Sequence, residues 1–281
     1  MPTNNSTSLV DRDWLDAHHT DPSVRVVEVD VSATTYERGH IAGAVLWNVY
    51  ADLKDSDYHL VGPGEVRRLF ERSGIEPSST VVFYGYAAAL GFWLMKLYGH
   101  PGVAILDSDR DSWLGEGRPW SDETAVPAPT VYPLQTEDGA IRATAATVRD
   151  AIGGAGGPLL DVRTDAEFSG ERFWPSGGME PGGRAGHVPT AVHAPLDGMY
   201  GTDGSFRERA ELAAILPGGD GAITYCTIGG RAATAWFVLS ELLGHDGVRV
   251  YDGSWAEWGR MADTPVAAGE VSAARRSEGA G

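Results

Sequence analysis

Cysteine and lysine are scarce in this chain. Its 281 residues include one cysteine, Cys226, and two lysines, Lys54 and Lys96. One cysteine excludes an internal disulfide, a CxxC redox pair and a cysteine zinc cage. Two lysines leave few candidates for Schiff-base chemistry, and the chain has neither a GxxxxGKS/T phosphate loop nor an HExxH zinc motif. Cys226 is therefore the only thiol in the chain that could act as a nucleophile.

Positive charge is also scarce. The chain has 22 Lys and Arg against 39 Asp and Glu, which gives a net charge of −17. So acidic a chain repels phosphate backbones and anionic lipid surfaces, so we expect neither a nucleic acid nor a membrane as partner. A small anionic substrate stays possible, because positive charge near the binding site can outweigh the negative charge of the whole chain.

Long apolar runs are missing as well. No uncharged apolar stretch approaches the ~20 residues of a membrane-spanning helix. The N-terminal residues are polar and lack the basic, apolar and small-residue order of a signal peptide. The expected location is the cytoplasm. Hydrophobic residues make up 42% of the chain, enough for a packed core.

The chain repeats itself. Four segments of the first half recur in the same order in the second half, which indicates two tandem copies of one domain. The matched pairs are VVEVD (26–30) with LLDVR (159–163), YERGHIAGAV (36–45) with GRAGHVPTAV (183–192), TVVFYG (80–85) with AITYC (222–226), and LYGHPGVAILD (97–107) with LLGHDGVRVYD (242–252).

The repeats suggest domain boundaries. We predict an N-terminal domain over 8–120, a linker over 121–140 that is rich in proline and acidic residues, a C-terminal domain over 141–268, and a disordered tail over 269–281. Within each copy, short apolar runs alternate with helical patterns. This predicts an α/β fold in which each copy is a parallel sheet covered by helices on both faces.

Cys226 lies where ligands of such sheets usually bind, at the carboxyl end of a predicted strand. A short loop follows, Thr227-Ile228-Gly229-Gly230, and a helix is predicted to begin near Arg231. Backbone N–H groups at a helix N-terminus favour negative charge, so Cys226 should react as a thiolate near neutral pH. The two glycines permit backbone conformations that turn several N–H groups inward around an anionic sulfur, a persulfide or an oxyanion.

These motifs together resemble a known family. The GHxxxA stretches, YCTIGGR and GHDGVRVYDGSW are similar to those of two-domain rhodanese-type sulfurtransferases, which include thiosulfate and 3-mercaptopyruvate sulfurtransferases. The resemblance covers about residues 8–268 and is strongest to an actinobacterial-like branch. It implies a tandem rhodanese fold whose C-terminal copy carries the catalytic cysteine in a six-residue loop, here Cys226 to Arg231.

The resemblance also implies a reaction. The cysteine takes a sulfane sulfur from a small anionic donor, thiosulfate or 3-mercaptopyruvate, and becomes a persulfide. It then passes the sulfur to a thiophilic acceptor, which is cyanide, a thiol or a protein. No metal and no organic cofactor are implied. Thr227, Ile228, Gly229, Gly230 and Arg231 would form the cradle around the persulfide.

The loop departs from the family pattern. In the actinobacterial branch it typically begins Cys-Arg-Ile-Gly-Glu-Arg, whereas Thr227 and Gly230 stand here at the Arg and Glu positions. Arg231 is then the one charged residue of the loop. We therefore expect weak binding of thiosulfate, a dianion.

Substrate-binding residues elsewhere match less well. Family members often carry an arginine shortly after the Asp-X-Arg strand, and the matching position here is Glu167. Arg172 or Arg184, in an inserted segment, would then be the candidates for anion binding. His59 matches a histidine that helps to activate the cysteine in mercaptopyruvate enzymes. Its usual aspartate partner has no clean match.

Other recurring residues have structural interpretations. Gly85 stands opposite Cys226 in the first copy, so that copy lacks a nucleophile and is predicted to be a wall of the cleft. Asp161 and Arg163 are expected to form a buried ion pair that supports the loop. The paired histidines, His40 with His187 and His100 with His245, are expected to bond to the backbone or pack.

Two other functions fit part of the pattern. Cysteine-dependent phosphatases and arsenate reductases use Cys-X5-Arg, but here the spacing is Cys-X4-Arg, which leaves less room for tetrahedral phosphate. A non-enzymatic or pathway-dedicated sulfur carrier would keep the fold and the cysteine. The first hypothesis remains a sulfurtransferase.

Overall fold

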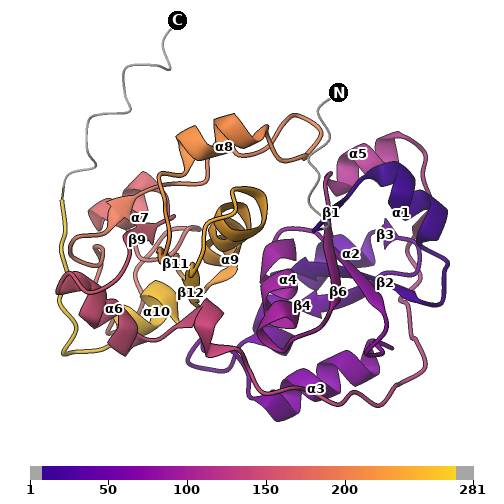
Figure 1. Ribbon diagram of the computed structural model, residues 1–281, viewed down its shortest axis with the longest axis horizontal. Helices are drawn as coiled ribbons and strands as arrows, with labels where there is room; N and C mark the ends of the chain where they lie inside the picture. The colour runs from indigo at the N-terminus through magenta and orange to yellow at the C-terminus, as the bar shows by residue number, and fades with distance from the viewer. Residues whose placement is uncertain (1–7, 270–281) are drawn as a thin grey trace, which may run out of the picture.

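Two parallel sheets of five strands form the frame of the molecule, which a computed structural model describes over residues 8–269 (Figure 1). The strand orders are β1-β6-β5-β2-β4 and β8-β12-β11-β9-β10, and every neighbouring pair is parallel. The two orders are the same when β8 is matched to β1, β9 to β2, β10 to β4, β11 to β5 and β12 to β6. The predicted tandem duplication is confirmed.

The N-terminal half supplies the first sheet and five α-helices. Its elements are β1 (Leu9–Val10), α1 (Arg12–His18), β2 (Val24–Asp30), α2 (Ala33–Glu37), β3 (His40–Ile41), β4 (Val45–Asn48), a π-helical turn (Val49–Leu53), α3 (Pro63–Arg72), β5 (Thr80–Tyr84), α4 (Ala88–Leu97), β6 (Gly102–Leu106), α5 (Arg110–Gly115) and β7 (Trp120–Ser121). Strands β3 and β7 pair with each other in a separate antiparallel ribbon.

The C-terminal half repeats this plan with shorter strands. Its elements are a 3-10 turn (Gly139–Ile141), β8 (Arg142–Ala143), α6 (Ala145–Ile152), β9 (Leu159–Asp161), α7 (Asp165–Ser169), β10 (Val192–His193), α8 (Arg209–Ile215), β11 (Ile223–Tyr225), α9 (Gly230–Phe237), a π-helical turn (Val238–Leu242), β12 (Arg249–Tyr251) and α10 (Ser254–Trp258). The isolated bridge between His187 and Ala267 stands where β3 and β7 pair in the first half.

Both faces of each sheet are covered, as the continuous apolar strands predict. Alternate residues of β5 enter different clusters: Val81 and Phe83 pack with residues of α3 and α4, whereas Val82 and Tyr84 pack with residues of α1 and α5. In the second sheet, Val250 shares a cluster with α8 and α9, and the neighbouring Tyr251 shares one with α6 and α10. The α/β fold class is confirmed.

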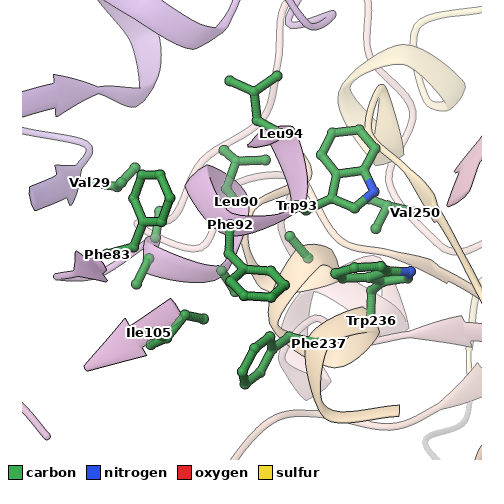
Figure 2. Close-up of a cluster of buried hydrophobic side chains, with 14 of the residues drawn as sticks. Val29, Phe83, Leu90, Phe92, Trp93, Leu94, Ile105, Trp236, Phe237 and Val250 are labelled. Carbon is green, nitrogen blue, oxygen red and sulfur yellow. The ribbon is translucent and has the colours of Figure 1, made fainter. Parts of the chain in front are cut away.

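The two halves share one core. Helices α4 and α9 pack side by side between the sheets (Figure 1). Figure 2 shows Phe92 of α4 against Trp236 and Phe237 of α9. The Phe92 and Phe237 rings meet edge to face, with centroids 4.9 Å apart. A single cluster of buried apolar residues therefore runs through both sheets.

The segment between the halves is extended. Residues 122–138 contain no helix or strand, and Thr130 holds them to the first half through hydrogen bonds with the backbone of Glu71 and Ile75. The boundaries 8–120, 121–140 and 141–268 stay predictions. Of the expected disordered tail, residues 270–281 lie outside the described part of the chain.

Candidate active site

Cys226 directly follows β11, and four residues separate this strand from α9. The thiol is buried, with 1% of the residue exposed. The backbone N–H of Gly229 lies 3.1 Å from Sγ and donates a hydrogen bond to it. The N–H of Cys226 itself bonds to the Ser254 hydroxyl at 3.1 Å. One backbone N–H of the loop therefore bonds to the sulfur, and the full cradle over residues 227–231 stays a prediction.

Gly229 has the backbone conformation that the loop needs. Its φ of +95° lies in the left-handed region, which favours glycine. A Cβ at this position would come within 2.9 Å of the carbonyl oxygen of Asp252. The glycine thus permits both the turn and the close approach of the loop to the chain beyond β12.

Helix α10 anchors the loop from the other side. The N–H groups of Trp255 and Ala256 donate to the carbonyl oxygens of Cys226 and Thr227, each at 2.9 Å. Ser254 begins α10 with a positive φ of +53°, and its hydroxyl donates to the Tyr251 carbonyl at 2.8 Å. These contacts tie the first two carbonyl groups of the loop to α10.

The charge of Arg231 is taken up by Glu167. The two guanidinium nitrogens Nη1 and Nη2 bond to the carboxylate oxygens at 2.9 and 2.8 Å. The Thr227 hydroxyl donates to the same carboxylate at 2.6 Å, and the Thr164 hydroxyl does so at 2.8 Å. Thr227 therefore faces Glu167 rather than the sulfur, and the loop offers a neutral pair instead of a free cation.

Glu167 is fully buried, and burial alone would raise its pKa. The hydrogen bonds and charge of Arg231, together with the two threonine hydroxyls, outweigh burial and lower the pKa of Glu167 from 4.5 to about 2. Because a carboxylate whose pKa is lower in the folded state stabilises the fold only while ionised, this contribution is present above pH 4.5 and is lost as the pH falls toward 2.

This linkage predicts an acid-sensitive contribution to stability. We expect the difference in unfolding free energy between the wild type and Glu167→Gln to shrink by about 2 kcal/mol between about pH 6 and about pH 3. Guanidinium titrations of both proteins at the two pH values measure it. Subtracting the two unfolding free energies cancels the contributions of the other carboxylates. A difference that does not change with pH would contradict the ion pair.

A second charged cluster lies beneath the loop and joins the two halves. The side chain of Lys54, fully buried, donates from Nζ to the Asp252 carbonyl at 2.9 Å and lies 3.8 Å from its carboxylate. Arg142 bonds to that carboxylate at 2.9 Å. Burial lowers the pKa of Lys54, although the attraction of Asp252 opposes the shift. A cation from the N-terminal half thus supports the loop of the C-terminal half.

A cavity of about 190 Å³ opens over Cys226. One wall comes from the N-terminal half, and the other comes from the loop and from the segment that follows α7. The lining residues are Val31, Val49, Tyr50, Tyr86, Ala87, Trp174, Pro175, Ser176, Cys226, Thr227, Ile228, Gly230 and Arg231. The first half therefore forms a wall of the cleft, as its missing nucleophile predicts.

Three predicted binding residues do not line this cavity. Arg184 donates to the carbonyl oxygens of Gly259 and Thr264, among others, and clamps the C-terminal segment. Arg172 reaches the Thr164 hydroxyl at 3.4 Å. His59 lies between Asp55 and Glu257, at 3.8 and 3.5 Å. Their roles in substrate binding stay predictions without support from the cavity.

The expected ion pair beside the loop is present. Both residues are fully buried, and Arg163 bonds to Asp161 through Nη2 at 2.6 Å. The guanidinium also donates to the Gly186 carbonyl at 2.7 Å and lies 4.6 Å from the centre of the Trp255 ring. The pair joins the end of β9 to α10, which in turn holds the loop.

Three of the four repeated histidines make the expected structural contacts, whereas the His245 ring lies 3.5 Å from the exposed carboxylate of Asp220. His40 and His187 stack on Tyr36 and Phe168 at the same centroid distance, 3.7 Å, and each bonds through Nδ1 to the carbonyl of its stacking partner. The same contact in a half without a nucleophile shows that it serves packing. His100 is buried and bonds to the Ser79 carbonyl at 2.8 Å.

The part of the chain that the structure describes contains neither a metal cluster nor a helix able to span a membrane. Between residues 8 and 269, no group of three or more His, Cys, Asp or Glu side chains is placed to hold a metal ion. None of the helices in this range combines the length and the apolar character needed to cross a membrane.

Sequence reasoning gave no role in the site to four residues that pair with the loop, lie beneath it or line the cavity: Glu167, Lys54, Tyr86 and Trp174. Glu167 has a visible signal, because Thr164-x-x-Glu167 is the capping-box spacing, which turns a glutamate back toward the start of its helix. Lys54 and Tyr86 have no local signal, since they reach the site only because the two halves pack together. Trp174 comes from the segment after α7 in the C-terminal half.

Comparisons with known proteins agree with the fold. A model of the rhodanese-like domain matches residues 144–261. A putative thiosulfate sulfurtransferase, SseA of Mycobacterium tuberculosis, is 40% identical over 93% of this chain and 91% of its own. The sulfur carrier protein TtuD of Thermus thermophilus is 37% identical, over 93% and 97%. The crystal structure of Escherichia coli SseA, 24% identical, matches with a TM-score of 0.75 over 89% of this chain and 99% of that one.

Proposed function

The chain belongs to the rhodanese-type sulfurtransferases, and from that premise we propose that Cys226 carries the transferred sulfur as a persulfide. The observation that supports this most directly is the Gly229 N–H, which lies 3.1 Å from Sγ at the floor of a cavity. A preorganised N–H donor stabilises negative charge on sulfur without reorganisation during the reaction. The same donor can serve the thiolate and the persulfide anion.

The proposed reaction has two displacements. The Cys226 thiolate attacks the outer sulfur of thiosulfate, the S–S bond of the donor breaks, and sulfite leaves with its electron pair. A thiophilic acceptor, cyanide or a thiol, then attacks the terminal sulfur of the persulfide and leaves the thiolate regenerated. A neutral sulfur atom moves at the sulfane oxidation level in both steps, so neither step needs an external oxidant or reductant.

Thiosulfate is the first donor to test because of the names of the relatives, with 3-mercaptopyruvate second. Binding of thiosulfate should be weak, since Arg231 is already paired with Glu167. The same pair weighs against a phosphatase, because a guanidinium bonded to a buried carboxylate has fewer N–H donors and no net charge to offer phosphate. A pathway-dedicated sulfur carrier is the second candidate, and the relative named as one supports it.

Mass spectrometry and kinetics on one preparation test the proposal. After treatment with thiosulfate, the intact protein should gain the mass of one sulfur atom, and cyanide should remove it as thiocyanate. Steady-state thiocyanate production should show a KM for thiosulfate above about 1 mM, the upper end of the usual range. A protein that loads one sulfur but does not turn over would be a carrier, and one that never loads would refute the proposal.

The cytoplasmic location and the absence of nucleic-acid and membrane partners also stay proposals. The absence of these partners is inferred from the acidic composition, with its net charge of −17. Fractionation of cells that produce the native chain would test the location.

A further inference from the structure

The cavity over Cys226 presents little uncompensated positive charge to a small dianion. Arg231 is the one charged residue that lines it within the described part of the chain. Both of its terminal nitrogens bond to Glu167, so its charge is compensated before a ligand arrives. Lys54 lies under the loop with no exposed side-chain surface and does not line the cavity.

Three aromatic side chains line the cavity. Tyr50, Tyr86 and Trp174 line the cavity from three separate segments: the π-helical turn, the loop between β5 and α4, and the segment after α7. Tyr50 is 47% exposed and Tyr86 62%. Exposed aromatic rings gathered around a nucleophile form a surface on which a flat apolar group can stack.

The size of the cavity fits such a group. Its volume is about 190 Å³. A cavity of about 150 Å³ lined by apolar side chains takes up benzene. Val31, Val49 and Ile228 complete an apolar lining, so a donor that carries an aryl group can fill space that thiosulfate leaves to water.

We propose that the preferred sulfur donor is an organic monoanion, an aryl-bearing sulfane sulfur compound, whose ring lies against Tyr86 and its aromatic neighbours while its outer sulfur reaches Cys226. The inference rests on the proposed function and specifies its donor. With an arylthiosulfonate, the thiolate attacks the outer sulfur, the S–S bond breaks, and an arylsulfinate leaves with the electron pair. The protein keeps the sulfur as a persulfide.

Two matched donors test the proposal. Benzenethiosulfonate and methanethiosulfonate carry the same charge and the same reacting group and differ in the ring. Rates with each donor are divided by its uncatalysed rate with cyanide, which removes intrinsic reactivity. We expect the corrected kcat/KM of the wild type to favour the aryl donor at least about tenfold, because a stacked ring adds to the burial of apolar area.

Variants at position 86 separate stacking from other effects. Tyr86→Ala should reduce the aryl preference about two- to tenfold, the range expected for one aromatic contact. Tyr86→Phe keeps the ring and should keep the preference. Because the side chain is largely exposed, neither variant should unfold the protein.

The outcomes distinguish this inference from the proposed function. A wild type that forms the persulfide with both donors at equal corrected rates would overturn the inference and leave sulfur transfer intact. So would an aryl preference that survives unchanged in Tyr86→Ala. A protein that takes sulfur from neither donor, and from neither thiosulfate nor 3-mercaptopyruvate, would instead overturn the proposed function.

Discussion

Replacing Cys226 with serine should lower sulfur transfer by about four orders of magnitude or more, the scale on which enzymes lose activity with their nucleophile. The hydroxyl is a far weaker nucleophile than a thiolate, and a persulfide cannot form on it. Intact mass after donor treatment should show one added sulfur on the wild type and none on Cys226→Ser. The rate of thiocyanate formation gives the kinetic effect.

The change is small enough to leave the fold intact. Serine differs from cysteine by one atom, so a thermal unfolding curve close to that of the wild type would show that the loss is chemical. Residual activity well above the uncatalysed rate in the serine variant would contradict a covalent intermediate at this position. It would do so decisively, since the chain has no second cysteine.

Replacing Gly229 with alanine should lower kcat about a hundredfold, as removal of one preorganised N–H donor does in acyl-transfer enzymes. The new Cβ would meet the Asp252 carbonyl at 2.9 Å and Lys54 Nζ at 3.3 Å, and the left-handed backbone would be strained. The loop must shift, and with it the N–H that holds Sγ. Single-turnover formation of the persulfide measures the effect on the first chemical step.

Gly43→Ala is the matched control for backbone strain. Gly43 has a φ of +80° in the turn between β3 and β4, and a Cβ there meets no atom within 4 Å. It should cost stability for the same conformational reason but leave kcat unchanged. If Gly229→Ala kept full activity, or if both variants lost activity equally, the Gly229 N–H would have no special role at the sulfur.

The fold could be predicted because its signals are local and repeated. The apolar strand before Cys226 and the helix after Arg231 are both found where their patterns place them. Because the sequence repeats, each element can be predicted from either copy. A short strand such as β9 is easier to predict because its equivalent in the first copy, β2, is longer. The exact ends are less regular, since α9 passes into a π-helical turn at Val238.

The loop of the active site could be predicted for the same reason, but the cavity around it could not. Cys226, Gly229 and Arg231 are close in sequence, so their arrangement follows from one strand–loop–helix unit. Glu167, which lies 60 positions before Thr227, reaches the loop through tertiary packing alone. Arg184 of the inserted segment, a predicted candidate for anion binding, bonds to backbone carbonyls and does not line the cavity.

The structure explains why the loop lacks the charged residues of its relatives. The sequence suggests a loss of charged residues, because related loops have an arginine at the position of Thr227 and a glutamate at the position of Gly230. Thr227 is almost fully buried and bonds to Glu167, so it completes the polar shell of the Arg231 pair. Glu167 thus compensates the charge of Arg231, and the proposed donor selectivity rests on the aromatic residues that line the cavity, Tyr50, Tyr86 and Trp174.

The shared core of α4 and α9 bears on motion. Two domains joined by a small polar interface usually move relative to each other, whereas a large apolar interface holds them as one body. Here Phe92, Trp236 and Phe237 interlock across the junction (Figure 2). We therefore expect the cavity beside this junction to keep its width without a hinge motion. A donor would then enter a gap of fixed size, and its shape would decide whether it binds.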